Sequence, residues 1–120
     1  MDLLRTVLQV FVSLGILNVW LLRANLATPY RPGGARNMRE EFAAYGLPFS
    51  AMCVIGVLKV ALALALLAGI WFPILVLPAA IGLGVLMLGA FAMHLKVKDP
   101  IKKAFPSLGV LALCAIIALL

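Results

Sequence analysis

The chain has 120 residues, of which 66% are hydrophobic and only 12% are charged. A soluble domain carries about 45–50% apolar and about 25% charged residues, and a fold of this size in water cannot bury so much apolar surface. The same composition excludes a disordered chain, which needs low hydrophobicity. The net charge of +6 comes mainly from the connections between apolar runs. There it suits anionic lipid headgroups better than nucleic acid, which we do not expect as a partner. The sequence therefore indicates an integral membrane protein whose solvent is the bilayer.

Four apolar stretches follow one another along the chain, each close to the roughly 20 residues that span a bilayer as a helix. They predict spans at about residues 3–23, 49–72, 74–95 and 101–120. The first stretch lacks a basic cluster before it and a small-residue cleavage site after it, so we interpret it as a retained span and not a signal peptide. The expected fold is an all-α, antiparallel bundle of four spanning helices in a single transmembrane domain, residues 1–120.

The connections between the spans differ in length. Trp71, Phe72 and Pro73 mark a tight turn between spans two and three, which makes these two helices adjacent and antiparallel. Before span four, the side chain of Asp99 can cap the helix, and Pro100 suits the first helical position, where its missing N–H costs nothing.

The connection between spans one and two predicts a short amphipathic helix at residues 37–46. Asn37 and Glu40 form a capping-box-like pair at its start. Gly46 can end the helix in the left-handed conformation, and Pro48 prevents its continuation. Its apolar face consists of Met38, Phe42 and Tyr45. We expect this helix to lie in the membrane interface or against the mouth of the bundle, although an ordinary capped loop helix is equally compatible with the pattern.

Lysine and arginine are distributed unequally between the two sides of the predicted bundle. The side that holds the connections 24–48 and 96–104 collects eight of these residues, whereas the opposite side has Arg5 alone. The eight are Arg23, Arg31, Arg36, Arg39, Lys96, Lys98, Lys102 and Lys103. Because positively charged loops stay in the cytoplasm, we expect both connections to be cytoplasmic and both termini outside, in a bacterial-type inner membrane.

Lys59 lies near the middle of the second span, where a lysine costs about 2.5–3.5 kcal/mol on insertion scales. No Asp or Glu lies within a predicted span, so a charged ammonium there needs Ser13, Asn18, backbone carbonyls, water or a ligand. Two hypotheses follow. Either the lysine is structural, satisfied by its neighbours or uncharged, or it forms with Ser13 and Asn18 a binding site for an anionic or carbonyl-bearing ligand.

Small residues recur every four positions in spans two and three. They are Ala61, Ala65 and Gly69 in span two, with Ala80 and Gly84 in span three. Such a stripe lets helix backbones approach closely, which is the main route to helix association in lipid. The central lysine lies about 160° around the helix from Ala61, so we expect it to face away from this stripe, toward span one.

His94 ends the third span next to the basic connection. It is either solvated or carbonyl-bonded at the interface, or paired with the carboxylate of Asp99. The chain has one histidine and few carboxylates, so no metal site is expected. The sequence also lacks a nucleophile–base–acid set and a phosphate-binding loop, which favours a protein without catalytic residues of its own.

Three motifs resemble the DoxX-like family of small four-span membrane proteins. Residues 94–100, HLKVKDP, are similar to the family's His-x4-Asp-Pro motif, and basic residues follow them here as they do there. Residues 42–48, FAAYGLP, match an amphipathic segment that ends in Gly-x-Pro, here Gly46 and Pro48. Residues 56–59, GVLK, resemble the family's Gly-x-Leu-Glu, but with a lysine where the family often has an acid.

The resemblance implies a modest range of functions. Founding members are associated with a membrane thiosulfate:quinone oxidoreductase, others with redox-stress complexes, and an animal branch with assembly of acetylcholine receptors. We therefore expect a non-catalytic accessory subunit or assembly factor without a bound cofactor, whose partner is another membrane protein or a second copy of the chain. One alternative is an oxidoreductase subunit that binds a quinone or similar lipophilic ligand near Lys59, and another is a small transporter.

Overall fold

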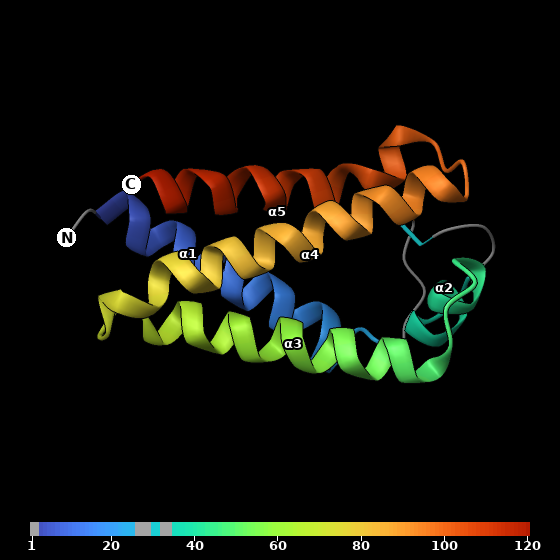
Figure 1. Ribbon diagram of the computed structural model, residues 1–120, viewed down its shortest axis with the longest axis horizontal. Helices are drawn as coiled ribbons and strands as arrows, with labels where there is room; N and C mark the ends of the chain where they lie inside the picture. Colours follow the sequence, from blue (N-terminus) through green and yellow to red (C-terminus); the bar gives the residue numbers. More distant parts are fainter. Residues whose placement is uncertain (1–2, 26–29, 32–34) are drawn as a thin grey trace.

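The computed structural model describes residues 3–25, 30–31 and 35–120 of the chain (Figure 1). In chain order its elements are α1 (Leu3–Leu17), which continues as the π-helix η1 (Asn18–Leu22), α2 (Met38–Ala44), α3 (Phe49–Ala68), the 3-10 turn η2 (Pro73–Leu75), α4 (Val76–Lys96) and α5 (Ile101–Leu119). No strand occurs in these described ranges. The all-helical fold predicted from composition is confirmed.

Four helical segments are long and apolar enough to cross a membrane. They are Leu3–Leu22, Phe49–Ala68, Pro73–Lys96 and Ile101–Leu119. The bundle is 43 Å long, which matches the roughly 40–45 Å of a bilayer with its headgroups. Large apolar side chains on its outer surface are exposed, for example Ile74 (84%) and Leu119 (88%), as expected where lipid surrounds the helices. The protein is an integral membrane protein.

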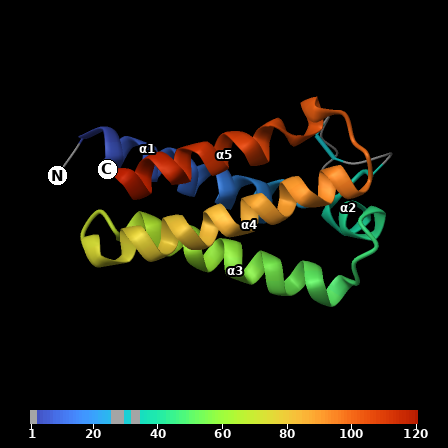
Figure 2. The same cartoon turned by 45° about the horizontal axis from the view of Figure 1, so that its top comes forward.

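The four long helices run alternately up and down, with α1 against α3 and α5, and α4 against α3 and α5 (Figures 1 and 2). Both chain termini and the turn between α3 and α4 lie at one end, which we call the termini end (Figure 1). The helix α2 and the loop between α4 and α5 lie at the other, which we call the loop end (Figure 1). The three connections between the spans therefore lie where an antiparallel arrangement requires.

The short helix α2 has the predicted cap at Asn37 and the predicted turn at Gly46, but at Met38–Ala44 it is shorter than the predicted segment 37–46. The Asn37 side chain accepts a hydrogen bond from the Glu40 N–H at 2.8 Å. The Glu40 carboxylate in turn accepts from the Arg36 N–H at 2.9 Å, one residue earlier than in a standard capping box. Gly46 has φ of +80°, the left-handed conformation that ends a helix at glycine. Met38 and Phe42 are buried and so is Tyr45 just beyond α2, so this side of the segment packs onto the bundle.

Two helix boundaries differ from the sequence prediction. Helix α3 ends at Ala68, and the predicted last turn of that span is instead part of the connection to α4. Asp99 does not cap α5, which begins at Ile101 after Pro100 without a side-chain cap. The prediction was wrong because the Asp99 carboxylate is bonded to His94 instead, at 2.8 Å from Nδ1.

The stripe of small residues does not form a single buried face. Gly69 and Ala80 are buried and Ala65 packs against the core, but Ala61 is exposed and Gly84 is half-buried. The buried positions of α3 are instead Gly56, Ala63 and Leu66. The assignment of Ala61 to a packing seam is thus wrong for the single chain, because Ala61 lies on the side of α3 opposite to this buried row.

Candidate ligand-binding site

A cavity of about 600 Å³ lies toward the loop end of the bundle, among α1, η1, α2, α3, α4 and α5. Ligand pockets have volumes of about 300–1,000 Å³ and combine apolar walls with a few polar groups. The apolar walls include Phe11, Val12, Ile16, Met87, Val110 and Leu113. The polar lining residues are Asn18, Arg23, Tyr30, Arg31, Glu41, Lys59, His94, Lys103 and Ser107. The cavity therefore has the composition of a site for a molecule with an apolar body and a polar head.

Lys59 projects into this cavity from the buried side of α3. Its Nζ lies 5.4 Å from the centroid of the Trp20 ring, within cation–π range. The Trp20 ring itself packs against α3 at Gly56, where an added Cβ would lie 2.6 Å from the nearest ring atom. Because Trp20 belongs to the last turn of the first span, the lysine side chain extends from mid-helix toward the loop end.

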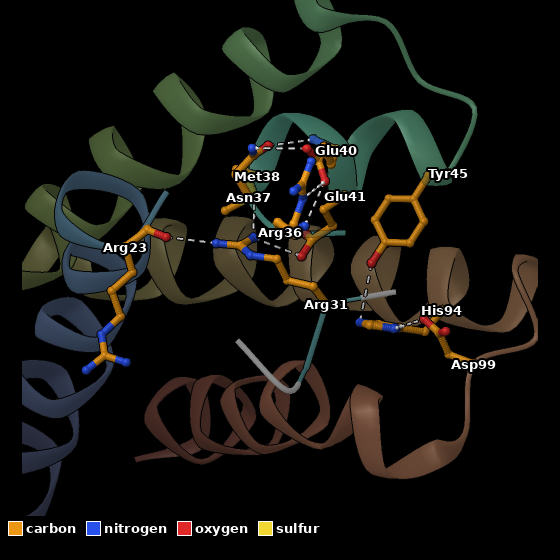
Figure 3. A network of polar contacts seen from close by, with 10 residues as sticks. All are labelled: Arg23, Arg31, Arg36, Asn37, Met38, Glu40, Glu41, Tyr45, His94 and Asp99. Carbon is orange, nitrogen blue, oxygen red and sulfur yellow. Dashed lines mark hydrogen bonds and ion pairs between the residues drawn. The ribbon is translucent and has the colours of Figure 1, made fainter. Parts of the chain in front are cut away.

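Arg31 lines the cavity at the loop end, and Figure 3 shows its polar contacts. Its side chain is 3% exposed and donates to the Glu41 carboxylate at 3.1 Å and to the Arg23 carbonyl at 2.8 Å. Burial raises the pKa of Glu41, and the positive charges of Arg31 and Lys59 oppose this rise. Helix α2 thus brings a carboxylate close enough to Lys59 for their charges to interact.

His94 lies between two polar partners at the edge of the cavity (Figure 3). Its Nδ1 is 2.8 Å from the Asp99 carboxylate, and its Nε2 is 3.4 Å from the Tyr45 hydroxyl. Burial raises the pKa of Tyr45 well above its usual value, so the phenol keeps its proton. With Nδ1–H donating to the Asp99 carboxylate, Nε2 is left to accept the hydrogen bond that the Tyr45 hydroxyl donates. Of the two interpretations of His94, the structure has the histidine–carboxylate pair, and the histidine is buried (7% exposed).

A row of four aromatic rings runs from η1 through the α2 segment to α4. Trp20, Phe42, Tyr45 and His94 follow one another in edge-to-face contacts, with centroids 6.0, 6.1 and 5.9 Å apart. The Lys96 ammonium adds a hydrogen bond to the Tyr45 carbonyl at 2.9 Å. These contacts attach α2 to η1 at one side and to α4 at the other.

The three residues predicted to bind a ligand do not lie together. Lys59 and Asn18 line the cavity, whereas Ser13 is fully buried and does not. Ser13 and Asn18 are five positions apart, which places them about 140° apart around a helix. Within the described part of the chain, the Ser13 Oγ and the Gln9 Oε1 are buried without a hydrogen-bond partner. The Gln9 amide donates to the Leu66 carbonyl at 3.0 Å.

Sequence reasoning assigned no role in the site to Trp20, Arg31 and Glu41. The spans contain no carboxylate that could act on Lys59, but Glu41 lies outside the spans on α2, and its negative charge acts on the lysine. Arg31 was counted as one of eight loop cations, yet it is buried, unlike the exposed Arg36 and Arg39. The sequence did contain one indication that Glu41 points toward the bundle. It directly precedes Phe42, which belongs to the apolar face of α2.

The remaining motif residues hold the backbone around this site. Gly46 takes its left-handed turn beside Lys96, whose Nζ would lie 3.6 Å from an added Cβ. Pro48 precedes the first residue of α3 in an extended conformation, and Pro100 does the same for α5. The two motifs therefore meet at the loop end, one before α3 and one between α4 and α5.

The fold and this cavity define a small four-span helical membrane protein with a polar pocket at one end. The sequence profile of the DoxX-like family matches residues 10–117, nearly the whole chain, and the chain belongs to this family. Comparison with curated proteins gives no match, and neither does comparison with solved structures.

Proposed function

We propose that this DoxX-like protein is an accessory membrane subunit whose bundle holds a lipophilic molecule, with the polar head of that molecule near Lys59. The observation that carries the proposal is the ammonium group of Lys59 inside a cavity of about 600 Å³. Among the described residues, the Trp20 ring lies beside its Nζ, and the charge of Glu41 acts on it without an ion pair. An ammonium has three donors and is costly to bury without acceptors. A carbonyl or anionic head would supply them.

The apolar lining of the cavity supports a lipophilic body for this molecule. Apolar side chains from α1, α4 and α5 form the part of the wall nearer the membrane interior. A quinone is one molecule of this kind, since its carbonyl oxygens accept hydrogen bonds and its tail is apolar. The subunit itself needs no catalytic group for this role, because a partner enzyme would perform the chemistry on the bound molecule.

The test compares the molecules that remain bound after purification. Wild-type protein, Lys59→Met and Lys102→Met are purified in the same detergent, extracted with organic solvent and analysed by mass spectrometry. Lys102 is an exposed lysine at the start of α5 and serves as the matched control. We expect a lipophilic molecule in stoichiometric amount in the wild type and in Lys102→Met, and its loss from folded Lys59→Met. Equal amounts in all three proteins, or none in any, would contradict the proposal.

A second candidate function uses the loop end as a docking surface for a partner protein. Arg36, Arg39, Lys98 and Lys102 are exposed there, whereas Arg5 lies near the opposite end. This surplus of positive charge at the loop end also supports the proposed orientation, in which the loop end lies in the cytoplasm and both termini lie outside a bacterial inner membrane. Single cysteines at positions 36 and 102 should be labelled only from the cytoplasmic side; labelling from outside would reverse the orientation.

A further inference from the structure

The charges that line the cavity are unequal in sign. Its lining contains four basic side chains, Arg23, Arg31, Lys59 and Lys103, together with His94 and one carboxylate, Glu41. Arg31 and Glu41 offset each other across 3.1 Å, so the cavity keeps a surplus of positive charge. Arg23 is exposed and Lys103 is half-buried, so water screens both charges, whereas the charge of Lys59 inside the cavity is screened less. The cavity therefore favours a ligand head with a negative charge over one with a neutral carbonyl.

The cavity also reaches the outer surface of the bundle between α1 and α5. Phe11, Gly15 and Val19 of the first span line it on one side, and Pro106 and Gly109 of α5 line it on the other. All five are exposed. In a bundle that spans a membrane, this surface faces lipid. We call this opening the lateral opening.

Two glycines leave the lateral opening wide. A Cβ added at Gly15 or at Gly109 would meet no atom within 4 Å. A larger residue at either glycine would therefore fit into the lateral opening without disturbing a neighbour. A long-chain molecule can enter here from the bilayer with its tail still among the lipid chains.

We propose that the cavity binds a lipid with a single anionic head. The lipid enters through the lateral opening between α1 and α5, and Lys59 holds its head in the part of the cavity that Arg31 also lines. This inference rests on the proposed function and narrows its ligand to one chemical class. The lipid source follows from the opening, since a water-borne anion needs no path through the side of the bundle. The Trp20 ring lies 5.4 Å from the Lys59 Nζ, so its fluorescence should respond to a head bound there.

The experiment uses the fluorescence of Trp20. The chain has two tryptophans, and Trp71 lies exposed at the termini end, so Trp71→Phe leaves Trp20 as the reporter. Detergent-solubilised Trp71→Phe protein is titrated with stearate carrying a nitroxide close to its carboxylate, a short-range quencher. The methyl ester of the same compound is the neutral control. We expect the acid to quench at a concentration at least about tenfold lower than the ester, because only the acid pairs with the buried ammonium.

Variants of the lysine and of the glycines separate the head from the opening. In the Trp71→Phe background, Lys59→Met should remove the preference for the acid, and Lys59→Arg should keep most of it. Gly15→Leu and Gly109→Leu should slow or abolish quenching by filling the lateral opening. Gly89→Leu is the matched control, because Gly89 is also exposed with nothing within 4 Å of an added Cβ but does not line the cavity.

The outcomes distinguish this inference from the proposed function. Equal quenching by acid and ester would overturn the anionic head while leaving a lipophilic ligand site. Quenching by neither compound beyond the level of a soluble tryptophan analogue in the same micelles would overturn both. Displacement of the acid by inorganic phosphate at similar concentration would assign the site to a water-borne anion. Normal quenching in Gly15→Leu and Gly109→Leu would remove the lateral opening as the entrance.

Discussion

The two halves of the bundle have opposite interiors. Away from the loop end, the four helices enclose an apolar core in which every member is at most 5% exposed, and two of its members, Val12 and Ile16, also line the cavity. This core consists of Val12, Ile16, Ala63, Leu66, Val76, Ala79, Ala80, Leu83, Cys114 and Ile117. Toward the loop end, the helices enclose a cavity with charged side chains. The comparison shows how so small a protein divides its length, with one half packing the helices together and the other holding a cavity with polar walls.

The residue types explain why the halves differ. Alanines at 63, 79 and 80 let α3 and α4 pack closely, as small residues do between membrane helices. At the loop end α1 widens into the π-helix Asn18–Leu22, an irregularity that is frequent at functional sites. This turn carries Trp20 and Asn18 into the cavity. The polar half therefore depends on local distortion and the closed half on regular packing.

The largest effect on stability should come from the closed half. Leu83 is fully buried, so Leu83→Ala removes packing contacts that lipid cannot replace inside the core. We expect a loss of about 2 kcal/mol in the free energy of unfolding, at the low end for leucine, because no transfer from water contributes in a membrane. Unfolding in mixed micelles with increasing denaturing detergent measures it. Leu88→Ala, on the same helix but 55% exposed, should change little; equal losses would mean that the two halves do not differ as described.

The same contrast marks what the sequence could predict. Hydropathy and run length were sufficient for the four helices, because a span depends only on its own residues. The start and end of α2 were also predictable, since Asn37 bonds a backbone N–H three residues away and Gly46 acts on its own turn. Such local interactions leave a sequence signal. They fixed the frame around the cavity but not its contents.

The contents of the cavity come from residues that are far apart in the chain. Trp20 and Lys59 meet across 39 positions and Tyr45 and His94 across 49, and no periodicity predicts such pairs. Asp99 shows how a distant contact alters a local one. Its sequence position favoured a helix cap, but the nearby imidazole competes for the carboxylate and takes it. The same limit explains Ser13, whose depth in the span matched Lys59 but whose direction around α1 did not.

A smaller effect is expected where α2 attaches to α4. From the sequence alone, His94→Ala should leave the bundle folded, because the residue was placed at the interface. Since His94 is buried and bonded to Asp99 and Tyr45, we now expect the folded bundle to lose about 1–2 kcal/mol. Tyr45→Phe, which removes one longer bond, should cost about 0.5–1 kcal/mol. The same unfolding assay measures both, and an unchanged stability in His94→Ala would show that these bonds do not hold α2 in place.

The smallest effect is the pH dependence of α2, which again separates a buried group from an exposed one. Burial raises the pKa of Glu41 above its ordinary value of 4.5 in the folded protein. The folded state therefore holds this proton more tightly, and the stability that Glu41 contributes below pH 4.5 is lost as the pH rises through the folded value. The charges of Arg31 and Lys59 oppose this rise in pKa, which keeps the effect on stability small.

Glu40, one residue away, changes stability with pH in the opposite direction, because the hydrogen bond from the Arg36 backbone lowers its pKa. Its contribution is present above the ordinary pKa and is lost as the pH falls. Unfolding of Glu41→Gln, Glu40→Gln and the wild type is compared at several pH values from below 4.5 upward. Glu41→Gln should lose less stability with rising pH than the wild type, and Glu40→Gln should lose less with falling pH. Identical pH profiles for the two variants would mean that α2 does not hold Glu41 inside the bundle.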